Sequence, residues 1–184
     1  AKNIRGIVKV IPSYHVSCNI LVGNASDPKF ILFAHYDSIE KGATDNASGV
    51  SILMDIIISN PEILRNYLYV FSGQEELSFD KPTYWGHGFR VFEKKYKNIM
   101  EKCQNIFIVD SVGNGKTVLE QDEKMAHLGF PVSRIEKWGK KIFLCHGDMG
   151  KLMKVYHTED DSVNQLKNKY LNEAKVLLTK ILMD

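Results

Sequence analysis

The sequence predicts an α/β protein in the form of a three-layer α/β/α sandwich around a mixed, largely parallel sheet. Apolar runs of strand length alternate along the chain with segments whose apolar residues recur at helical spacing. Strands that are apolar on both faces are typical of parallel sheets covered by helices on each side. With 184 residues, 44% of them hydrophobic, and no linker rich in Pro, Gly or Ser, the chain is expected to form one domain over residues 1–184.

The strands are the first elements that the pattern defines. Alternation of apolar and polar residues over 14–22 predicts a half-exposed strand. Continuous apolar runs predict buried strands at 29–34, 67–71, 106–109 and 141–145. The segment 113–116 superficially resembles a phosphate loop, but it lacks the required spacing, so we expect a hairpin turn there.

Helices are predicted between these strands. Apolar spacing indicates helices over 47–59 and 89–100, and Asn60 followed by Pro61 ends the first of them. A closing helix over 163–183 carries an apolar stripe that includes Leu166 and Leu178.

Composition excludes several classes of function. The formal net charge is +2, and the charged residues are interspersed, so a nucleic-acid partner is not indicated. No apolar stretch approaches the length of a membrane span, so a membrane partner is not indicated either. Cys18, Cys103 and Cys145 are odd in number and widely spaced, which indicates reduced, mostly buried thiols and a cytoplasmic location, with an exported form as the alternative. The first residues show no secretory signal pattern, and because the chain begins at Ala1, a processed N-terminus stays open.

Imidazole and carboxylate side chains follow three of the predicted buried strands. His35, the pair Glu75 and Glu76, and Asp110 each lie just beyond the end of such a strand. In open α/β sheets, ligands bind at the carboxyl ends of the strands. Each residue alone has a simple structural interpretation, as a core histidine, a solvated turn or a helix cap, but their joint occurrence at one edge predicts a metal site.

The complete set of motifs resembles the co-catalytic zinc exopeptidases of the bacterial leucyl aminopeptidase and aminopeptidase Y type, which are related to glutamate carboxypeptidase and glutaminyl cyclase. The motifs occur in the order expected for that family, at residues 35–38, 42–49, 75–76, 108–110 and 157–161. The resemblance implies the zinc exopeptidase fold and two Zn²⁺ ions per chain.

The same resemblance assigns roles to individual residues. His35 and Asp110 would complete one zinc site and Glu76 and His157 the other, with Asp45 bridging both metals. Asp37 would accept a hydrogen bond from the imidazole of His35, and Asp161 or Asp160 would orient the region of His157. Glu75 would act as the general base. The family also implies a cis peptide bond between Asp45 and Asn46.

Other parts of the chain depart from the family or carry no motif. The segment 77–84 looks like a short insertion near the cavity, and 113–156 matches poorly, so these segments are expected to form the pocket walls, with apolar residues (Leu77, Phe79, Tyr84 and Trp85) favouring uncharged substrate side chains. His15, His87, His127 and His146 lack carboxylates at useful spacing and are expected to be structural. Ser38 and Ser48 are not set in a nucleophile elbow.

The expected function is a zinc-dependent aminopeptidase that removes N-terminal residues from peptides with a free N-terminus. Glutaminyl-peptide cyclase is the main alternative and would use one zinc ion, whereas a carboxypeptidase or amide deacylase would use the same core. A non-catalytic, peptidase-like binding module is disfavoured because such relatives generally lose metal ligands, and here all five are present. The oligomeric state and the preferred N-terminal residue are left open.

Overall fold

The three-layer architecture predicted from the sequence is confirmed by the computed structural model, which describes residues 16–183. Its sheet has six strands in the order β1-β3-β2-β4-β6-β5. The parallel centre is formed by β3 (Tyr67–Ser72), β2 (Phe30–His35), β4 (Asn105–Val109) and β6 (Ile142–His146). The edge strands β1 (Ile20–Gly23) and β5 (Val118–Glu120) are antiparallel to their neighbours.

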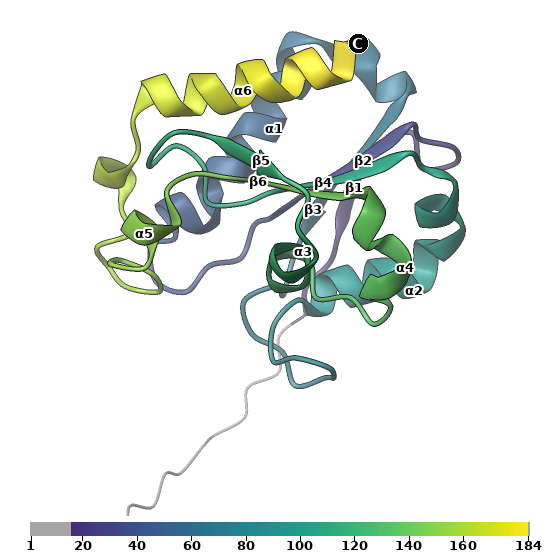
Figure 1. Ribbon diagram of the computed structural model, residues 1–184, viewed down its shortest axis with the longest axis horizontal. Coiled ribbons are helices and arrows are strands. Elements are labelled where there is room, and N and C mark those ends of the chain that lie inside the picture. The colour runs from purple at the N-terminus through teal and green to yellow at the C-terminus, as the bar shows by residue number, and fades with distance from the viewer. Residues whose placement is uncertain (1–15, 184) are drawn as a thin grey trace, which may run out of the picture.

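Helices cover both faces of this sheet. α1 (Ser48–Ser59) and α6 (Asn168–Met183) lie on one face, and α2 (His87–Lys102), α3 (Glu123–Gly129) and α4 (Ile135–Trp138) lie on the other (Figure 1). Shorter helical segments are α5 (Met149–Leu152), Ala43–Ala47, Pro61–Arg65, Gly139–Lys141 and Val163–Gln165. No helix in the range 16–183 is both long and apolar enough to cross a lipid bilayer.

The central strand β2 shows why both faces must be covered. All six of its residues are buried. Phe30 and Leu32 pack with Leu53 of α1 and Leu178 of α6, whereas Phe33 packs with aromatic residues of α2 on the opposite face. Because side chains alternate along a strand, one continuous apolar run supplies both cores.

The connections place the carboxyl ends of β2, β3 and β4 at one edge. The chain leaves β2 through α1 to reach β3 on one side, then passes through α2 on the other face to reach β4 on the far side of β2. The direction in which strands are added to the sheet thus reverses at β2. Such a reversal creates a crevice outside the strand ends, which is where open α/β sheets bind ligands. The predicted location of the site therefore follows from the strand order.

Most predicted elements agree with the structure to within one or two residues, but three expectations need correction. The strand predicted over 14–22 is observed only as Ile20–Gly23, and residues 14 and 15 lie outside the described range. The final helix begins at Asn168 rather than at 163, because Val163–Gln165 forms a separate turn and Leu166 has extended backbone. The segment 113–116 is not a hairpin turn, since β5 pairs with β6 and not with β4.

Candidate metal centre

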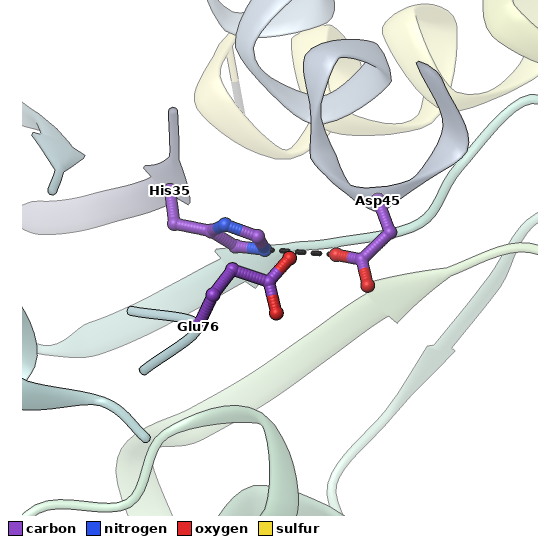
Figure 2. Close-up of side chains that lie close together, drawn as sticks. All are labelled: His35, Asp45 and Glu76. Atoms are coloured by element: carbon purple, nitrogen blue, oxygen red, sulfur yellow. Dashed lines mark ion pairs between the residues drawn. The ribbon is translucent and has the colours of Figure 1, made fainter. Parts of the chain in front are cut away.

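The five expected metal ligands come together at the carboxyl edge of the sheet. His35 is the last residue of β2, Asp110 directly follows β4, and Glu76 follows β3 after a short turn. Asp45 lies in the helical turn that precedes α1, and His157 lies in the loop after α5. Figure 2 shows the side chains of His35, Asp45 and Glu76 converging from these separate segments.

The carboxylate of Asp45 faces two different imidazoles. Its Oδ1 lies 3.0 Å from Nε2 of His35, and its Oδ2 lies 3.8 Å from Nε2 of His157. On the first side, Oδ1 of Asp110 is 3.6 Å from Nε2 of His35. On the second side, Oε2 of Glu76 is 2.6 Å from Nε2 of His157. The ligands thus separate into two groups that share one carboxylate.

These separations suit zinc on the first side in particular. Two donor atoms bound to one tetrahedral zinc at about 2.0 Å lie about 3.3 Å apart. The distances of 3.0 and 3.6 Å from His35 to Asp45 and Asp110 bracket that value. Donor atoms of His35, Asp45 and Glu76 also all lie within 4.8 Å of one another.

The imidazole of His35 presents the correct nitrogen to this centre. Its Nδ1 is 3.0 Å from the backbone carbonyl oxygen of Asp37, and because a carbonyl only accepts hydrogen bonds, Nδ1 carries the proton in the neutral ring. The lone pair on Nε2 is then directed toward Asp45 and Asp110. His35 is only 2% exposed, so this orientation is fixed by burial as well.

Burial and crowding change the protonation of the acidic residues. Burial, together with the negative charges of Asp110 and Asp45, raises the pKa of Glu75 to about 8. Burial and the charge of Asp45 raise the pKa of Glu76 to about 9. The buried Oε1 atom of Glu76 has no hydrogen-bond partner among the described residues. The raised pKa values of the two glutamates show that several carboxylates are crowded around two histidines, and this donor set fits divalent cations, which would replace the protons.

Asp37 supports the centre in a different way from the one predicted. Its Oδ1 lies 3.8 Å from Nδ1 of His35, too far for a hydrogen bond, and its backbone carbonyl takes that place. Its Oδ2 instead accepts hydrogen bonds from the backbone N–H groups of Glu75 (2.8 Å) and Glu76 (3.0 Å). The carboxylate of Asp37 thus fixes the glutamate pair relative to β2, which makes it a positioning residue.

Asp161, rather than Asp160, has the buried structural role, and it acts on Asp45 rather than on His157. Asp161 is 1% exposed, and its carboxylate accepts hydrogen bonds from the backbone N–H groups of Thr44 (2.9 Å) and Asp45 (3.0 Å). Asp160 is exposed. Asp161 therefore holds the turn that carries the shared carboxylate.

The turn around Asp45 is also tied to the end of β4. The peptide bond between Asp45 and Asn46 is cis, as the family resemblance implied. The buried amide of Asn46 donates to the carbonyl oxygen of Val109 (2.9 Å) and accepts from the backbone N–H groups of Gly49 and Ser111. These contacts fix the distance between Asp45 and Asp110.

Left-handed backbone conformations adjoin the ligands. Among residues 16–183, four non-glycine residues have positive φ, namely Glu40, Gln74, Ser111 and His157. Gln74 precedes the glutamate pair, Ser111 follows Asp110, and His157 is itself a ligand candidate. Such conformations are unfavourable for residues with a Cβ atom and are concentrated at functional sites in proteins.

A cavity of about 380 Å³ opens beside the ligand candidates and has a largely apolar wall. Glu75 lines it, so the expected general base faces the same space as the metal ligands. The apolar lining comes from the loop before α2, from α3, from the region of α5 and from β6: Tyr84, Trp85, Met125, Leu128, Leu144, Met149, Leu152, Met153 and Tyr156. The indole N–H of Trp85 donates to the carbonyl oxygen of Leu128 (3.1 Å) and joins two parts of this wall.

The sequence-based expectation for the pocket was only partly right. Tyr84 and Trp85 line the cavity as predicted, whereas Leu77 and Phe79 are 58% and 94% exposed and do not line it. The segment 113–156 contributes to the wall as predicted and ends at Tyr156, which was not singled out by itself. The aromatic ring of Tyr156 stacks on His157 with ring centroids 3.6 Å apart.

Two histidines expected to lack carboxylate partners have them. Nδ1 of His87 is 3.0 Å from Oδ2 of Asp80, and Nε2 of His146 is 3.0 Å from Oε1 of Glu120. His146 lines the cavity, but its Nδ1 is engaged with the carbonyl oxygen of Gly147 (2.8 Å), so neither ring nitrogen is free to bind a metal. His127 is exposed, and His15 lies outside the described residues.

Comparison with known proteins identifies the family that the motifs resemble. The sequence profile of peptidase family M28 matches residues 18–79, the segment that carries His35, Asp45, Glu75 and Glu76. The resemblance inferred from the motifs is therefore confirmed. Among curated proteins, none matches the chain significantly in sequence.

Solved structures share the fold at low sequence identity. A glutaminyl cyclase from Porphyromonas gingivalis is 18% identical, with a TM-score of 0.70 over 90% of this chain and 75% of that chain. A Zn-dependent exopeptidase from Parabacteroides distasonis is 16% identical, with a TM-score of 0.66 over 89% and 76%. An aminopeptidase from Aneurinibacillus sp. strain AM-1 is 17% identical, with a TM-score of 0.64 over 89% and 47%. This chain thus spans less than half the length of that aminopeptidase.

Proposed function

We propose that this protein is an aminopeptidase that uses two zinc ions and removes the N-terminal residue of peptides. One observation carries the proposal: the two oxygens of Asp45 face two separate histidines, each with a further carboxylate beside it. A shared carboxylate of this kind is what a two-metal site requires, because the metals must lie about 3.5 to 4 Å apart. The match of residues 18–79 to a peptidase family supports the same conclusion.

The residues divide the catalytic work between them. His35, Asp45 and Asp110 would hold one zinc ion, and Asp45, Glu76 and His157 the other. Zinc supplies Lewis acidity, which lowers the pKa of water and polarises a peptide carbonyl. Glu75 lines the same cavity and is not needed as a ligand, so it would take the proton from the attacking water and deliver it to the leaving amine.

The surroundings of the centre favour a substrate with a free α-amine. Two zinc ions would balance the charge of the carboxylates at this end of the cavity, where Asp45, Glu75 and Glu76 offer hydrogen-bond acceptors. A free α-amine has a lone pair that zinc can bind and N–H groups that these carboxylates can accept, whereas an acetylated N-terminus lacks the lone pair. The apolar wall beyond the centre, which includes Met125, Leu128 and Leu152, would receive an uncharged side chain.

Glutaminyl-peptide cyclisation is the second candidate. The Porphyromonas gingivalis cyclase aligns over 75% of its own length, compared with 47% for the Aneurinibacillus aminopeptidase, so the extent of this chain is closer to that of the cyclase. A cyclase acts on an N-terminal glutamine, whose α-amine attacks the carbonyl carbon of its own side-chain amide and displaces ammonia, and it would use one zinc ion. Glu75 would again serve as the proton carrier.

A substrate panel separates these functions. The zinc-loaded protein is assayed with aminoacyl chromogenic amides, with the same compounds N-acetylated, and with a glutaminyl peptide whose cyclisation is followed by mass spectrometry. We expect release of free amino acids from unblocked substrates only. Cleavage of acetylated substrates at the same rate contradicts the aminopeptidase and indicates a deacylase or carboxypeptidase.

Metal content provides an independent measurement. We expect about two equivalents of zinc per chain by elemental analysis, loss of activity on chelation and recovery on adding zinc. About one equivalent, together with cyclisation, would favour the cyclase. No binding of zinc even after supplementation would leave only a non-catalytic module.

A further inference from the structure

A second cavity, of about 470 Å³, lies on the other side of the loop that walls the catalytic cavity. The loop between Glu76 and α2 contributes Tyr84 and Trp85 to the catalytic cavity, and Asp80 and Lys81 to the second one. The remaining lining comes from α2, from the segment leading into α4 and from the end of α4, and the two helices lie on the same face of the sheet (Figure 1): His87, Arg90, Val91, Glu93, Lys94, Lys97, Ser133, Arg134 and Trp138.

Two buried charges hold the shape of this cavity. Arg90 is 5% exposed and donates to both carboxylate oxygens of Asp80 (2.7 and 2.6 Å) and to the carbonyl oxygen of Pro131 (2.8 Å). Glu93 is 6% exposed and accepts from the backbone N–H of Ser133 (2.8 Å) and the indole N–H of Trp138 (2.9 Å). The cavity is therefore bounded by groups that already have their partners.

The remaining charges around the cavity are positive. Lys81, Lys94 and Arg134 are exposed and form no ion pair with any residue in the range 16–183, and Lys97 pairs only with Glu101 at 3.5 Å. The lining holds five Lys and Arg side chains and two carboxylates, an excess of three positive charges. Asp80 is paired with Arg90, so the other four cations face one carboxylate, that of Glu93, which is bound to neutral N–H groups.

We propose that this cavity binds a small phosphate-bearing ligand. A concave space of this volume suits a small molecule, whereas a macromolecular partner is expected to bind a flatter surface. Lys ammonium groups and the planar guanidinium of Arg134 are suited to phosphate oxygens. The site is separate from the proposed function and does not depend on it.

Two substitutions and a matched control test the proposal. Inorganic phosphate is titrated into the zinc-loaded protein at low ionic strength and followed by isothermal titration calorimetry. We expect saturable binding of one phosphate at this cavity, weakened about tenfold or more by Lys94→Glu and by Arg134→Glu. Lys95→Glu makes the same charge change one position further along α2, at an exposed residue outside the cavity, and should leave this binding unchanged.

The outcomes separate this site from the metal centre. If phosphate binds equally tightly to all the variants, it binds at the zinc ions or non-specifically, and the proposal is overturned. The same follows if Lys95→Glu weakens binding as much as Lys94→Glu does, because the attraction is then only a long-range effect of net charge. Citrate serves as a carboxylate comparator, and citrate binding without phosphate binding would also overturn the proposal.

Fluorescence locates the ligand directly. The chain has two tryptophans, and Trp138 lines the second cavity whereas Trp85 lines the catalytic one. In Trp85→Phe, phosphate should still change the emission of Trp138, with the same midpoint as in calorimetry. Saturable calorimetric binding with no change in Trp138 emission would contradict binding beside α4. Because both measurements report binding, their failure says nothing against the peptidase function.

Discussion

The metal-binding edge and the apolar wall face each other across one cavity, but they are built differently. The edge consists of residues that follow three neighbouring parallel strands, together with Asp45 from the turn before α1 and His157 from the loop after α5. The carboxylates of Asp37 and Asp161 accept hydrogen bonds from backbone N–H groups of these segments, and the amide of Asn46 joins the turn to β4. The wall consists of side chains from the short helices α3 and α5, from β6 and from a loop. The first arrangement leaves each ligand little freedom, whereas the second constrains mainly size and polarity. We therefore expect substitutions at the edge to affect chemistry and those in the wall to affect selectivity.

The largest effects are expected within the glutamate pair. Glu75→Gln should retain zinc and lose about 10² to 10⁴ in turnover, the usual contribution of a positioned base. Glu76→Gln should lose zinc itself, because it removes a charged donor next to His157. Elemental analysis and turnover are measured on both variants. Equal loss of zinc in the two would show that the roles are assigned wrongly.

A smaller effect is expected at Asp161, with its neighbour as the control. Asp161→Asn removes a buried carboxylate that accepts from the backbone N–H groups of Thr44 and Asp45, so the free energy of unfolding should fall by about 1 to 3 kcal/mol. Asp160 is exposed, so Asp160→Asn should change the free energy of unfolding by less than about 0.5 kcal/mol. Urea unfolding of both metal-free variants measures the difference. Similar values for the two would contradict the structural role of Asp161.

The apolar wall should respond through substrate affinity. Leu128→Ala removes part of a half-exposed side chain that lines the cavity, so KM for a large apolar N-terminal residue should rise about tenfold. Zinc content and kcat for an N-terminal alanine should stay close to their original values. Comparison of kcat and KM for leucyl and alanyl substrates gives the answer. A change in zinc content would show that wall and edge are not independent.

The smallest effect concerns the cysteines, none of which lines the cavity. Burial raises the pKa of Cys103 to about 11 and that of Cys145 to about 12, whereas Cys18 is exposed. A thiol with a pKa of 12 is only about 10⁻⁴ ionised at pH 8, so Cys145 should react slowly with a thiol reagent in the folded protein. Ellman's reagent should titrate one thiol quickly and three after unfolding. Rapid reaction of all three would contradict the buried positions of Cys103 and Cys145.

The sequence predicted the edge of the site far better than its wall. Buried strands appear as continuous apolar runs, and the end of each run marks the residue that reaches the edge, which is how His35 and Asp110 were placed. The wall depends on the short helices α3 and α5, which have seven and four residues. Their apolar spacing covers too few residues to distinguish a helix from a loop. Phe79 was assigned to the pocket only because it is close to Glu76 in sequence, although its side chain points to solvent.

The hydrogen-bond partners of the supporting residues could not be predicted from the sequence either. Asp37 and Asp161 were both recognised as supporting residues, but each binds a segment other than the one expected. The reason is that Thr44 and Asp161 are 117 residues apart along the chain, and their contact follows from the fold rather than from local spacing. The partner of His146 was missed for the same reason, since Glu120 comes 26 residues before it. Asp80 is much closer to His87 in sequence, and their contact depends on the shape of the loop before α2.

The left-handed residues beside the ligands have a consequence for how this protein could evolve or be engineered. Gln74, Ser111 and His157 occupy a conformation that glycine tolerates better, so glycine at positions 74 or 111 would relieve local strain. The freedom that glycine adds would also loosen the segments that aim Glu75 and Asp110. Thermostable variants of this chain should therefore draw their improvements from the helices and outer loops, and leave the most strained part of the backbone as it is.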